Sequence, residues 1–283
     1  MNFAFGKNRR ARRIGSADSS AESARLIRGN IRMVRGLYTS ALGMITQMQR
    51  MDVVANNIAN VDTTAYKKDQ VVSQSFAEEL MKRINEPGVR LFKNFNIGKV
   101  SQGVFVDDIY TDFAPGTLRR TDASLDLAIS GYGFFSVNVN GEELYTRDGS
   151  FTLMPDGTLA TLDGGHVQGQ NGDIVIPHGD IDIDENGRIY SNGLYIDMLK
   201  LTDIADTHTL RKEQNNYYRI TAQTEFLPFE GQVLQGLLEN SNTKSVKEMV
   251  EMIALSRAYE TNSRMVTIHD TTLNRAVNDI ARR

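Results

Sequence analysis

The sequence of 283 residues predicts an α+β fold, in which a central antiparallel β domain is flanked by long N- and C-terminal α-helices. Three observations support this prediction. An apolar heptad pattern follows Val34, and a second helical pattern follows Ser245. Between them, turn signals separate short alternating segments, and twelve of the 23 glycines lie between Gly131 and Gly193.

Residues 1–32 differ from the rest of the chain in charge and composition. They carry eight Lys or Arg and two acidic residues, with little apolar periodicity. We interpret them as a disordered extension, or as an N-terminus assigned too far upstream, since the recognisable pattern begins at Met33. A basic arm that binds nucleic acid or membrane is the alternative, but aromatic residues are not interleaved with these arginines.

The first helical domain is assigned to residues 33–66, with its helix over about 34–59. Apolar residues recur along it in steps of four and three, which gives an unbroken heptad seam. The seam residues are Leu37, Ala41, Met44, Met48, Met51, Ala55 and Ile58. Strict heptads over three repeats favour a coiled-coil-like partner over an ordinary amphipathic surface helix.

The middle of the chain divides into a mixed linker, residues 67–104, and a β domain, residues 105–235. In the linker, the segment SFAEELMKRI predicts a short helix over 75–84, before a turn at 86–88. In the β domain, Asn140-Gly141 separates two alternating runs and predicts a hairpin with a type I′ turn. Further Asp-Gly and Asn-Gly pairs at eight- to twelve-residue spacing indicate short antiparallel strands.

The last segment, residues 236–283, is predicted to hold the C-terminal helix, over about 245–280. Ser245 and Glu248 form a capping-box pattern at its start, and apolar or small residues follow at helical spacing. Long helices gain most of their stability from packing an apolar face. Each terminal helix therefore needs a partner outside the β domain, either the other end of the chain or another copy.

The sequence contains no motif with the residue spacing that catalysis, cofactor binding or metal binding requires. Asp182, Asp184 and Asn186 match the first ligand positions of a calcium-binding loop, but Gly193 occupies the position that requires a bidentate Glu. None of the four histidines has a partner at zinc-ligand spacing, and neither a phosphate loop nor a nucleophile elbow is present. We therefore predict no catalytic residue, no cofactor and no metal.

Charge and hydropathy restrict the binding partners of the protein and the way in which it could be exported. The net charge of −3 suggests no nucleic-acid partner, and no apolar run approaches the length of a membrane span. The absence of cysteine excludes disulfides and thiolate chemistry. The first fifteen residues, MNFAFGKNRRARRIG, are charged but lack the apolar region of a cleavable signal peptide, so any export must use another signal.

Three separate motifs resemble those of one known family. MVRGLYTSALGM…RMDVVANNIANVDTTAYKKD, from Met33, resembles the N-terminal signature of bacterial flagellar axial proteins, the rod and hook family. GLLENSN…EMVEMIALSRAYETNSRMVTIHDTTLNRAV looks like their C-terminal signature. Between them, TDFAPGTLRRTDASLDLAISGYGFFSV…YTRDGSF resembles the β domain of FlgF/FlgG-type rod proteins. The resemblance covers nearly everything from Met33 onward.

This resemblance implies a structural subunit without catalysis. Members of the family stack helically into the hollow periplasmic rod of the basal body, with the terminal helices lining the inner tube and the β domain outside. The implied partners are copies of the chain, other rod subunits and the flagellar type III export apparatus, which requires no cleaved signal. Direct membrane insertion is not implied.

Two departures from the family pattern are informative. Ala65 stands where the family usually has glycine, which argues against a left-handed backbone there. The segment that distal-rod proteins usually carry after the first helix has no clear copy, and INEPGVRLF stands there instead. This favours a FlgF-like proximal-rod subunit, with a distal-rod or hook-type axial subunit as the alternative.

Given this resemblance, we expect the two terminal helices to pack as a coiled-coil-like pair. The N-terminal seam would face the C-terminal helix, chiefly at Val250, Ile253, Ala254, Ala258, Met265 and Ile268. Asn56, Asn57 and Asn60 fall off the seam. Asn60 is interpreted as ending the helix, and Asn56 and Asn57 as contacting neighbouring subunits. In an isolated subunit these amides are expected to face water.

Two other classes of protein remain as rivals from the sequence. A secreted β-rich hydrolase or adhesin predicts clustered carboxylates or histidines in a pocket, and activity as a monomer. A generic adaptor would bind the helices of another protein. The rod interpretation predicts extensive self-contact instead.

Overall fold

The structure, a computed structural model, describes residues 15–76, 79–82, 96–101, 103–177, 179–221 and 224–281. Side chains are described within these ranges except for 15–34, 79–82, 96–100, 280 and 281. The chain divides into two compact units. The helical unit comprises Met1–Met48, Ser73–Phe105 and Arg257–Arg283, and the β unit comprises Gln49–Val72 and Val106–Ser256.

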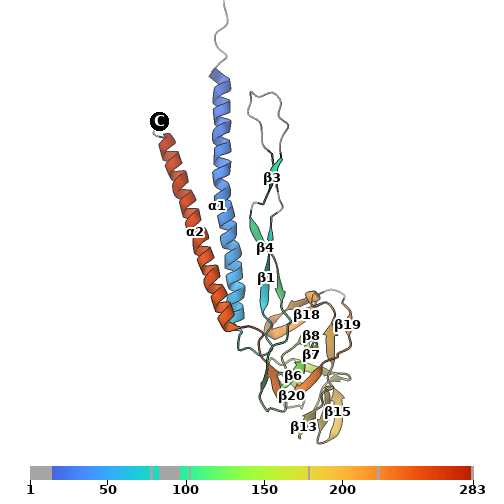
Figure 1. Ribbon diagram of the computed structural model, residues 1–283. Coiled ribbons are helices and arrows are strands. Elements are labelled where there is room, and N and C mark those ends of the chain that lie inside the picture. The colour runs from blue at the N-terminus through green and yellow to red at the C-terminus, as the bar shows by residue number, and fades with distance from the viewer. Residues whose placement is uncertain are drawn as a thin grey trace, which may run out of the picture. The chain divides into compact units, whose positions relative to one another are not determined.

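One long helix lies at each end of the chain, α1 (Gly15–Ala59) and α2 (Ser245–Ala281) (Figure 1). The predicted end of the first helix is confirmed, and Asn60 donates a side-chain hydrogen bond to the backbone oxygen of Asn56 (2.9 Å), which satisfies a carbonyl of the last turn. The start of α1 lies within the segment set apart as an extension, of which residues 1–14 are outside the described residues. No helix among the described residues has the length and apolar character needed to cross a membrane.

The prediction that the terminal helices form a coiled-coil-like pair is wrong. Met48 and Ala55 of the N-terminal seam are exposed, and so are Ile253 and Ile268 on α2. In the described residues, the helices meet instead through small and polar side chains. A methyl group added at Gly36 would lie 2.4 Å from His269, and one at Gly43 would lie 2.9 Å from Asn262. Arg50 pairs with Glu251 at 3.3 Å.

The apolar seam is therefore only partly covered. Of its seven residues, Met48 and Ala55 are exposed and the other five are half-buried. The α+β character and the antiparallel β domain are retained, but the helices are not joined by the predicted seam.

The linker also differs from its prediction. Residues 79–82 are a strand, β2, within the segment predicted to be a short helix. β2 (Glu79–Lys82) pairs with β3 (Asn96–Val100) in an antiparallel two-stranded sheet. β1 (Asp69–Ser75) and β4 (Val104–Thr111) form a second two-stranded sheet. Cross-strand pairing satisfies the backbone of this short segment, and so overrides its local helical pattern.

A ten-stranded antiparallel sheet forms most of the β unit, with its main path in the order β17-β18-β8-β7-β11-β10-β9. β12 and β16 branch from β11 and β7, and β19 pairs with β16. The strands of this sheet are β7 (Phe134–Val139), β8 (Glu142–Thr146), β9 (Phe151–Leu153), β10 (Leu159–Thr161), β11 (His166–Gly169), β12 (Gly172–Asp173), β16 (Leu201–Ile204), β17 (Leu210–Lys212), β18 (Tyr217–Ile220) and β19 (Phe226–Leu227).

Smaller sheets and two 3₁₀ turns complete the β unit (Figure 1). One has three strands, and two are antiparallel pairs, β5 with β21 and β6 with β20. Their bounds are β13 (Ile181–Ile183), β14 (Arg188–Ser191), β15 (Leu194–Met198), β5 (Leu118–Arg120), β21 (Leu237–Glu239), β6 (Leu127–Ser130) and β20 (Gln232–Gln235), and the 3₁₀ turns are η1 (Thr207–Thr209) and η2 (Gln214–Asn216).

The predicted type I′ hairpin is confirmed. β7 and β8 pair from Val139↔Glu142 onward, and the two turn residues, Asn140 and Gly141, have φ values of 54° and 88°. Asp184, a residue of the rejected calcium motif, ends a β-strand segment and accepts a hydrogen bond from the Asn186 N–H (3.1 Å). It stabilises a tight turn between β13 and β14.

The hydrophobic core of the β unit is built from strands that follow one another closely in the chain. Its main cluster consists of Leu127, Ile129, Phe135, Phe151, Leu159, Val167, Ile174, Ile176, Ile183, Ile189, Leu199 and Val233. A second cluster contains Phe134 and Tyr218, with Phe113 packed edge-on at 5.0 Å from the Tyr218 ring. This second cluster lies beside the polar junction described below.

Candidate assembly surfaces and the buried junction

Large apolar side chains are exposed along one face of each terminal helix. We call these faces the α1 stripe and the α2 stripe. The α1 stripe contains Tyr38, Ile45, Met48, Ala55 and Ala59, and the α2 stripe contains Val246, Met249, Val250, Ile253, Met265 and Ile268. Exposed apolar surface of this extent marks a site of interaction with another molecule.

The residues predicted to form an assembly interface are divided by the structure. Those that it leaves exposed are Met48, Ala55, Asn56, Val250, Ile253, Ala254, Met265 and Ile268. Those that it leaves half-buried are Leu37, Ala41, Met44, Met51, Ile58 and Ala258. The described residues in contact across the two helices lie at Gly36, Gly43 and Arg50, which the apolar pattern did not single out.

Asn57 does not face water, contrary to the expectation for an isolated subunit. Only 2% of the residue is exposed. Its amide nitrogen donates to the backbone oxygen of Asp69 (2.8 Å), and its amide oxygen accepts from the Asp69 N–H (3.0 Å) and the Tyr66 hydroxyl (3.1 Å). Asn57 therefore joins the last turn of α1 to the start of β1, and its burial makes it inaccessible to a neighbouring subunit.

Asn56 behaves differently from Asn57. Its side chain is exposed and accepts hydrogen bonds from Asn60 (2.8 Å) and from the Tyr66 hydroxyl (3.1 Å). Adjacent asparagines on a helix point about 100° apart. One of them therefore reaches the β unit and the other remains accessible.

A buried ionic cluster holds together stretches of the β unit that are distant in sequence. The Lys67 ammonium lies 2.6 Å from Glu239 Oε1, and Arg147 Nε lies 3.7 Å from Glu239 Oε2. Lys67 is fully buried, and Arg147 and Glu239 are each 2% exposed. Burial lowers the pKa of the Lys67 ammonium and of the Arg147 guanidinium, while the negative charge of Glu239 acts in the opposite direction.

Backbone groups complete the surroundings of this cluster. Lys67 donates to the carbonyl of Ala114 (2.9 Å), and the Gly116 N–H donates to Glu239 Oε1 (2.6 Å). Arg147 donates to the carbonyl of Gly131 (2.8 Å). We call the group of Lys67, Arg147 and Glu239, with these backbone partners, the junction. It connects four stretches that are distant in sequence.

Ala65 lies next to the junction in a left-handed conformation, with φ of 52°. Its N–H donates to the backbone oxygen of Glu239 (2.7 Å), and its side chain is buried. The argument from the missing glycine is therefore wrong, because this hydrogen bond and the close packing impose a backbone that costs Ala about 1–2 kcal/mol.

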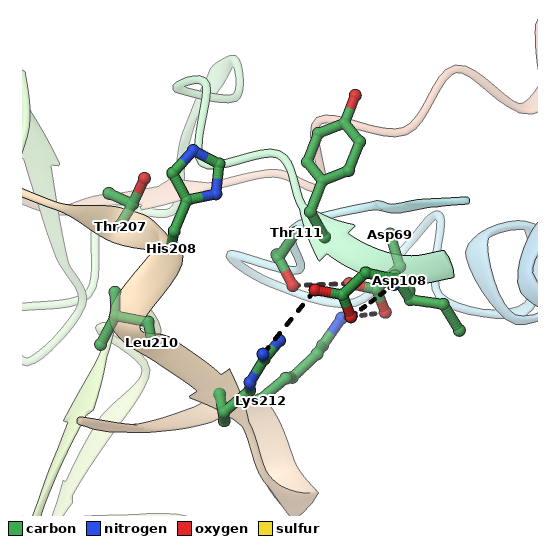
Figure 2. Close-up of a pocket in the computed structure, with 10 residues that line it drawn as sticks. Asp69, Asp108, Thr111, Thr207, His208, Leu210 and Lys212 are labelled. Atoms are coloured by element: carbon green, nitrogen blue, oxygen red, sulfur yellow. Dashed lines mark hydrogen bonds and ion pairs between the residues drawn. The ribbon is translucent and has the colours of Figure 1, made fainter. Parts of the chain in front are cut away.

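A second set of polar contacts lines a cavity of about 230 Å³ between β4 and β17 (Figure 2). Asp69 pairs with Lys212 (3.2 Å) and accepts from the Thr111 hydroxyl (2.7 Å), and Asp108 lies 3.7 Å from Arg211. These paired carboxylates bridge neighbouring strands. Across the described residues, no group of three His, Asp or Glu side chains could hold a metal ion.

The sequence patterns did not predict the junction. Lys67, Arg147 and Glu239 are charged residues within apolar or turn-rich surroundings, a pattern that is common at solvent-exposed strand ends. The one feature of the sequence that could have identified them is their position within the three motifs that carry the family resemblance. The structure brings these three residues together, so part of what the motifs encode is packing within the β unit.

Buried tyrosines near the junction predict loss of stability at alkaline pH. Burial raises the pKa of Tyr145 to about 12 and raises those of Tyr66 and Tyr218 further. Their contribution is complete below pH 10, the pKa of unfolded tyrosine, and is lost as pH rises through the folded pKa values. The lowered pKa of Lys67 acts in the opposite direction at pH values below its unfolded pKa of 10.5.

Absorbance and circular dichroism can test this pH dependence, because the chain has ten tyrosines and no tryptophan. We expect the buried tyrosines Tyr66, Tyr145 and Tyr218 to ionise only above pH 10, together with the loss of dichroism. Ionisation of all ten near pH 10 with the fold retained would contradict the prediction.

These features fit a class of protein: a structural subunit that has exposed apolar side chains on its terminal helices and a β domain with its own core. Three family models match the chain: "Flagella basal body rod protein" over residues 37–67, "Flagellar hook protein FlgE/F/G D1 domain" over 128–191, and "Flagellar basal body rod FlgEFG protein C-terminal" over 234–279. The three matches lie in α1 and the turn after it, the β unit and α2.

Full-length relatives agree. The flagellar basal-body rod protein FlgF of Caulobacter vibrioides is 33% identical over 238 residues, 83% of this chain and 93% of that protein. FlgG of Bacillus subtilis is 32% identical over 268 residues, 87% of this chain and 99% of that protein. The chain therefore belongs to the family of FlgF/FlgG-type flagellar rod proteins, and it is a structural subunit of the flagellar basal-body rod.

Proposed function

We propose that this subunit assembles through the α1 and α2 stripes, which neighbouring subunits cover in the rod. The exposed apolar side chains of these stripes carry the proposal, with Ile253 and Val250 at 55% and 62% exposure. Each apolar side chain that passes from half-exposed to covered contributes about 1 kcal/mol. The β unit has its own core, so the uncovered helix faces are where self-association gains most.

The partners and location follow from the family. We propose that copies of this chain and other rod subunits are the neighbours, with the helices lining the inner tube and the β units outside. The subunit would reach the periplasmic rod through the flagellar type III export apparatus, without a cleaved signal peptide. It would act without catalysis or a cofactor. Membership of the rod family favours this function over the hydrolase, adhesin and adaptor alternatives.

Of the predicted interface residues, Asn56 stays in the proposal and Asn57 does not. The Asn56 amide is exposed near the C-terminal end of α1, where a neighbouring helix could accept or donate a hydrogen bond. The Asn57 amide is used within the subunit.

Ile253→Asp tests the proposed surface. We expect the variant subunit to fold, because Ile253 is exposed, and the rod to be absent from basal bodies viewed by electron microscopy, with loss of motility. A charge in the middle of a covered apolar interface costs several kcal/mol.

Leu162→Asp is the matched control. Leu162 is 77% exposed in the β unit, outside both stripes, and this variant should retain rods and motility. Normal rods with Ile253→Asp would overturn the proposed surface, and so would a variant that loses the rod only because the monomer no longer folds.

A further inference from the structure

The β unit carries an exposed apolar surface of its own, apart from the two helix stripes. Tyr132, Phe226 and Leu227 are 66%, 57% and 45% exposed, and Pro228 is exposed as well. We call these four residues the β19 patch, because Phe226 and Leu227 form that strand. Large apolar side chains exposed in one place mark a surface that another molecule covers.

A cavity of about 260 Å³ joins the parts of this patch, since Tyr132 and Leu227 line it together. Phe113 and Phe134 also line it, and their rings pack edge-on with centres 5.5 Å apart. The Arg147 guanidinium, a further lining group, lies over the Phe134 ring at 5.8 Å from its centre. Aromatic rings and a guanidinium are the groups against which another aromatic ring packs well. The cavity therefore favours an aromatic side chain.

The patch is surrounded by carboxylates. The segments 203–206 and 225–230, which form most of it, contain four acidic residues and neither Lys nor Arg. Asp206, Glu225 and Glu230 are exposed, and none of them forms an ion pair among the described residues. The β19 patch therefore fits a partner that is both aromatic and basic.

One segment of the chain itself has this composition. Residues 1–14, MNFAFGKNRRARRI, contain Phe3 and Phe5, which five Lys or Arg follow, and no acidic residue. They lie outside the described residues. Residues 83–95 are also apolar and basic, but they include Glu86 and are joined at both ends to strands, β2 and β3. Residues 1–14 are therefore the better match in charge.

We propose that the β19 patch of one copy binds residues 1–14 of a second copy, with Phe3 or Phe5 in the cavity and the basic residues against the surrounding carboxylates. The inference rests on self-association of the subunit, which is the proposed function, and adds a contact outside both stripes.

The length of α1 favours a second copy over the same chain. Along this helix, Gly15 is about 51 Å from Gln49, the first residue of the β unit, at 1.5 Å per residue. Phe3 is twelve residues from Gly15, which spans at most about 43 Å. Residues 1–14 of another copy are not subject to this distance.

Binding of a synthetic peptide tests the proposal on the purified protein. A fluorescent peptide of residues 1–14 should bind the subunit from which residues 2–14 are deleted, as measured by fluorescence anisotropy. Binding should weaken at least about tenfold between about 0.05 and 0.5 M NaCl, because exposed charges are screened by salt. The peptide with Phe3→Ala and Phe5→Ala should also bind at least about tenfold more weakly, because no ring enters the cavity.

Tyr132→Ser in the subunit should weaken binding of the peptide at least about tenfold, because it removes one wall of the cavity. Tyr195→Ser is the matched control, since Tyr195 is 53% exposed in β15 and lies outside the patch. The control should change binding less than about twofold. Circular dichroism should be unchanged in both variants, because both side chains are exposed.

Charge reversal tests the ionic part of the contact. Glu225→Lys with Glu230→Lys should weaken binding of the peptide at least about tenfold, because like charges then face each other. Asp180→Lys with Asp182→Lys changes the net charge equally at exposed positions outside the patch, and should have less than about a third of that effect.

Several results would overturn the proposal. They are an equal loss of binding with Tyr195→Ser, an equal loss with the Asp180 and Asp182 variant, and tighter binding of a peptide of residues 83–95 than of residues 1–14. Binding of the peptide to phosphatidylglycerol vesicles but not to the subunit would assign the segment to a membrane surface instead. Ile253→Asp should leave peptide binding unchanged, so failure of the patch is distinguishable from failure of the stripes.

The absence of cysteine allows the contact to be tested in assembled basal bodies. With Phe3→Cys and Tyr132→Cys in one chain, oxidation should give a ladder of disulfide-linked subunits on a non-reducing gel. Phe3→Cys with Tyr195→Cys should give no ladder. A disulfide within a single chain, a ladder from the control, or basal-body subunits that lack residues 1–14 by mass spectrometry would each contradict the contact.

Discussion

Replacing Glu239 by glutamine is expected to lower the free energy of unfolding by about 3–5 kcal/mol, because it leaves two buried cations without a counter-charge. Glu239 is the acid within ion-pairing distance of both Lys67 and Arg147. Since a domain of ordinary stability has about 5–15 kcal/mol in total, this loss should be evident in urea unfolding followed by circular dichroism.

Glu230→Gln is the control for this variant. Glu230 is exposed, and its substitution should change the free energy of unfolding by less than about 0.5 kcal/mol. A loss below about 1 kcal/mol with Glu239→Gln would mean that water reaches the junction and screens its charges. That result would contradict the buried ionic cluster.

The same variant allows the interaction to be separated from the loss of either group. Adding Lys67→Met to Glu239→Gln removes one of the two unpaired cations, so the double variant should lose less stability than the two single variants summed. Simple additivity would show that Lys67 and Glu239 are energetically independent despite their 2.6 Å separation.

Replacing Asn57 by alanine is expected to cost about 3 kcal/mol in the isolated subunit. The substitution leaves the N–H and carbonyl of Asp69 without their partner and removes one acceptor of the Tyr66 hydroxyl. The loss therefore arises before any assembly, and should be measured by chemical unfolding of the purified monomer.

Asn56→Ala separates this role from an interface role. Asn56 is the adjacent residue and is exposed, so its replacement should leave the stability of the monomer within about 0.5 kcal/mol. If Asn57→Ala also left the monomer unchanged and weakened only rod assembly, the contact with Asp69 would not be the reason for asparagine at this position.

Local sequence patterns were sufficient where one local interaction decides the conformation. The end of α1 at Ala59 and the start of α2 at Ser245 follow from periodicity and polar residues at the helix ends. The turn between β7 and β8 follows from Asn140-Gly141, because few other residues accept two successive positive φ values. The family motifs likewise identified a rod protein before any contact was known.

Local patterns failed where two distant segments compete for the same groups. The segment 79–82 has a helical pattern, yet it forms a strand because 96–100 lies beside it and satisfies its backbone. Ala65 adopts a left-handed backbone because its N–H meets Glu239, a residue 174 positions away.

The sequence by itself determined the two long helices, the antiparallel β domain between them and the family to which the chain belongs, because periodicity and turn chemistry are properties of neighbouring residues. Only the tertiary structure decided which helix faces are covered, where Asn57 points and why three motifs share Lys67, Arg147 and Glu239. Burial and charge pairing depend on residues that are close in space, and a heptad count cannot tell which partner will cover an apolar face.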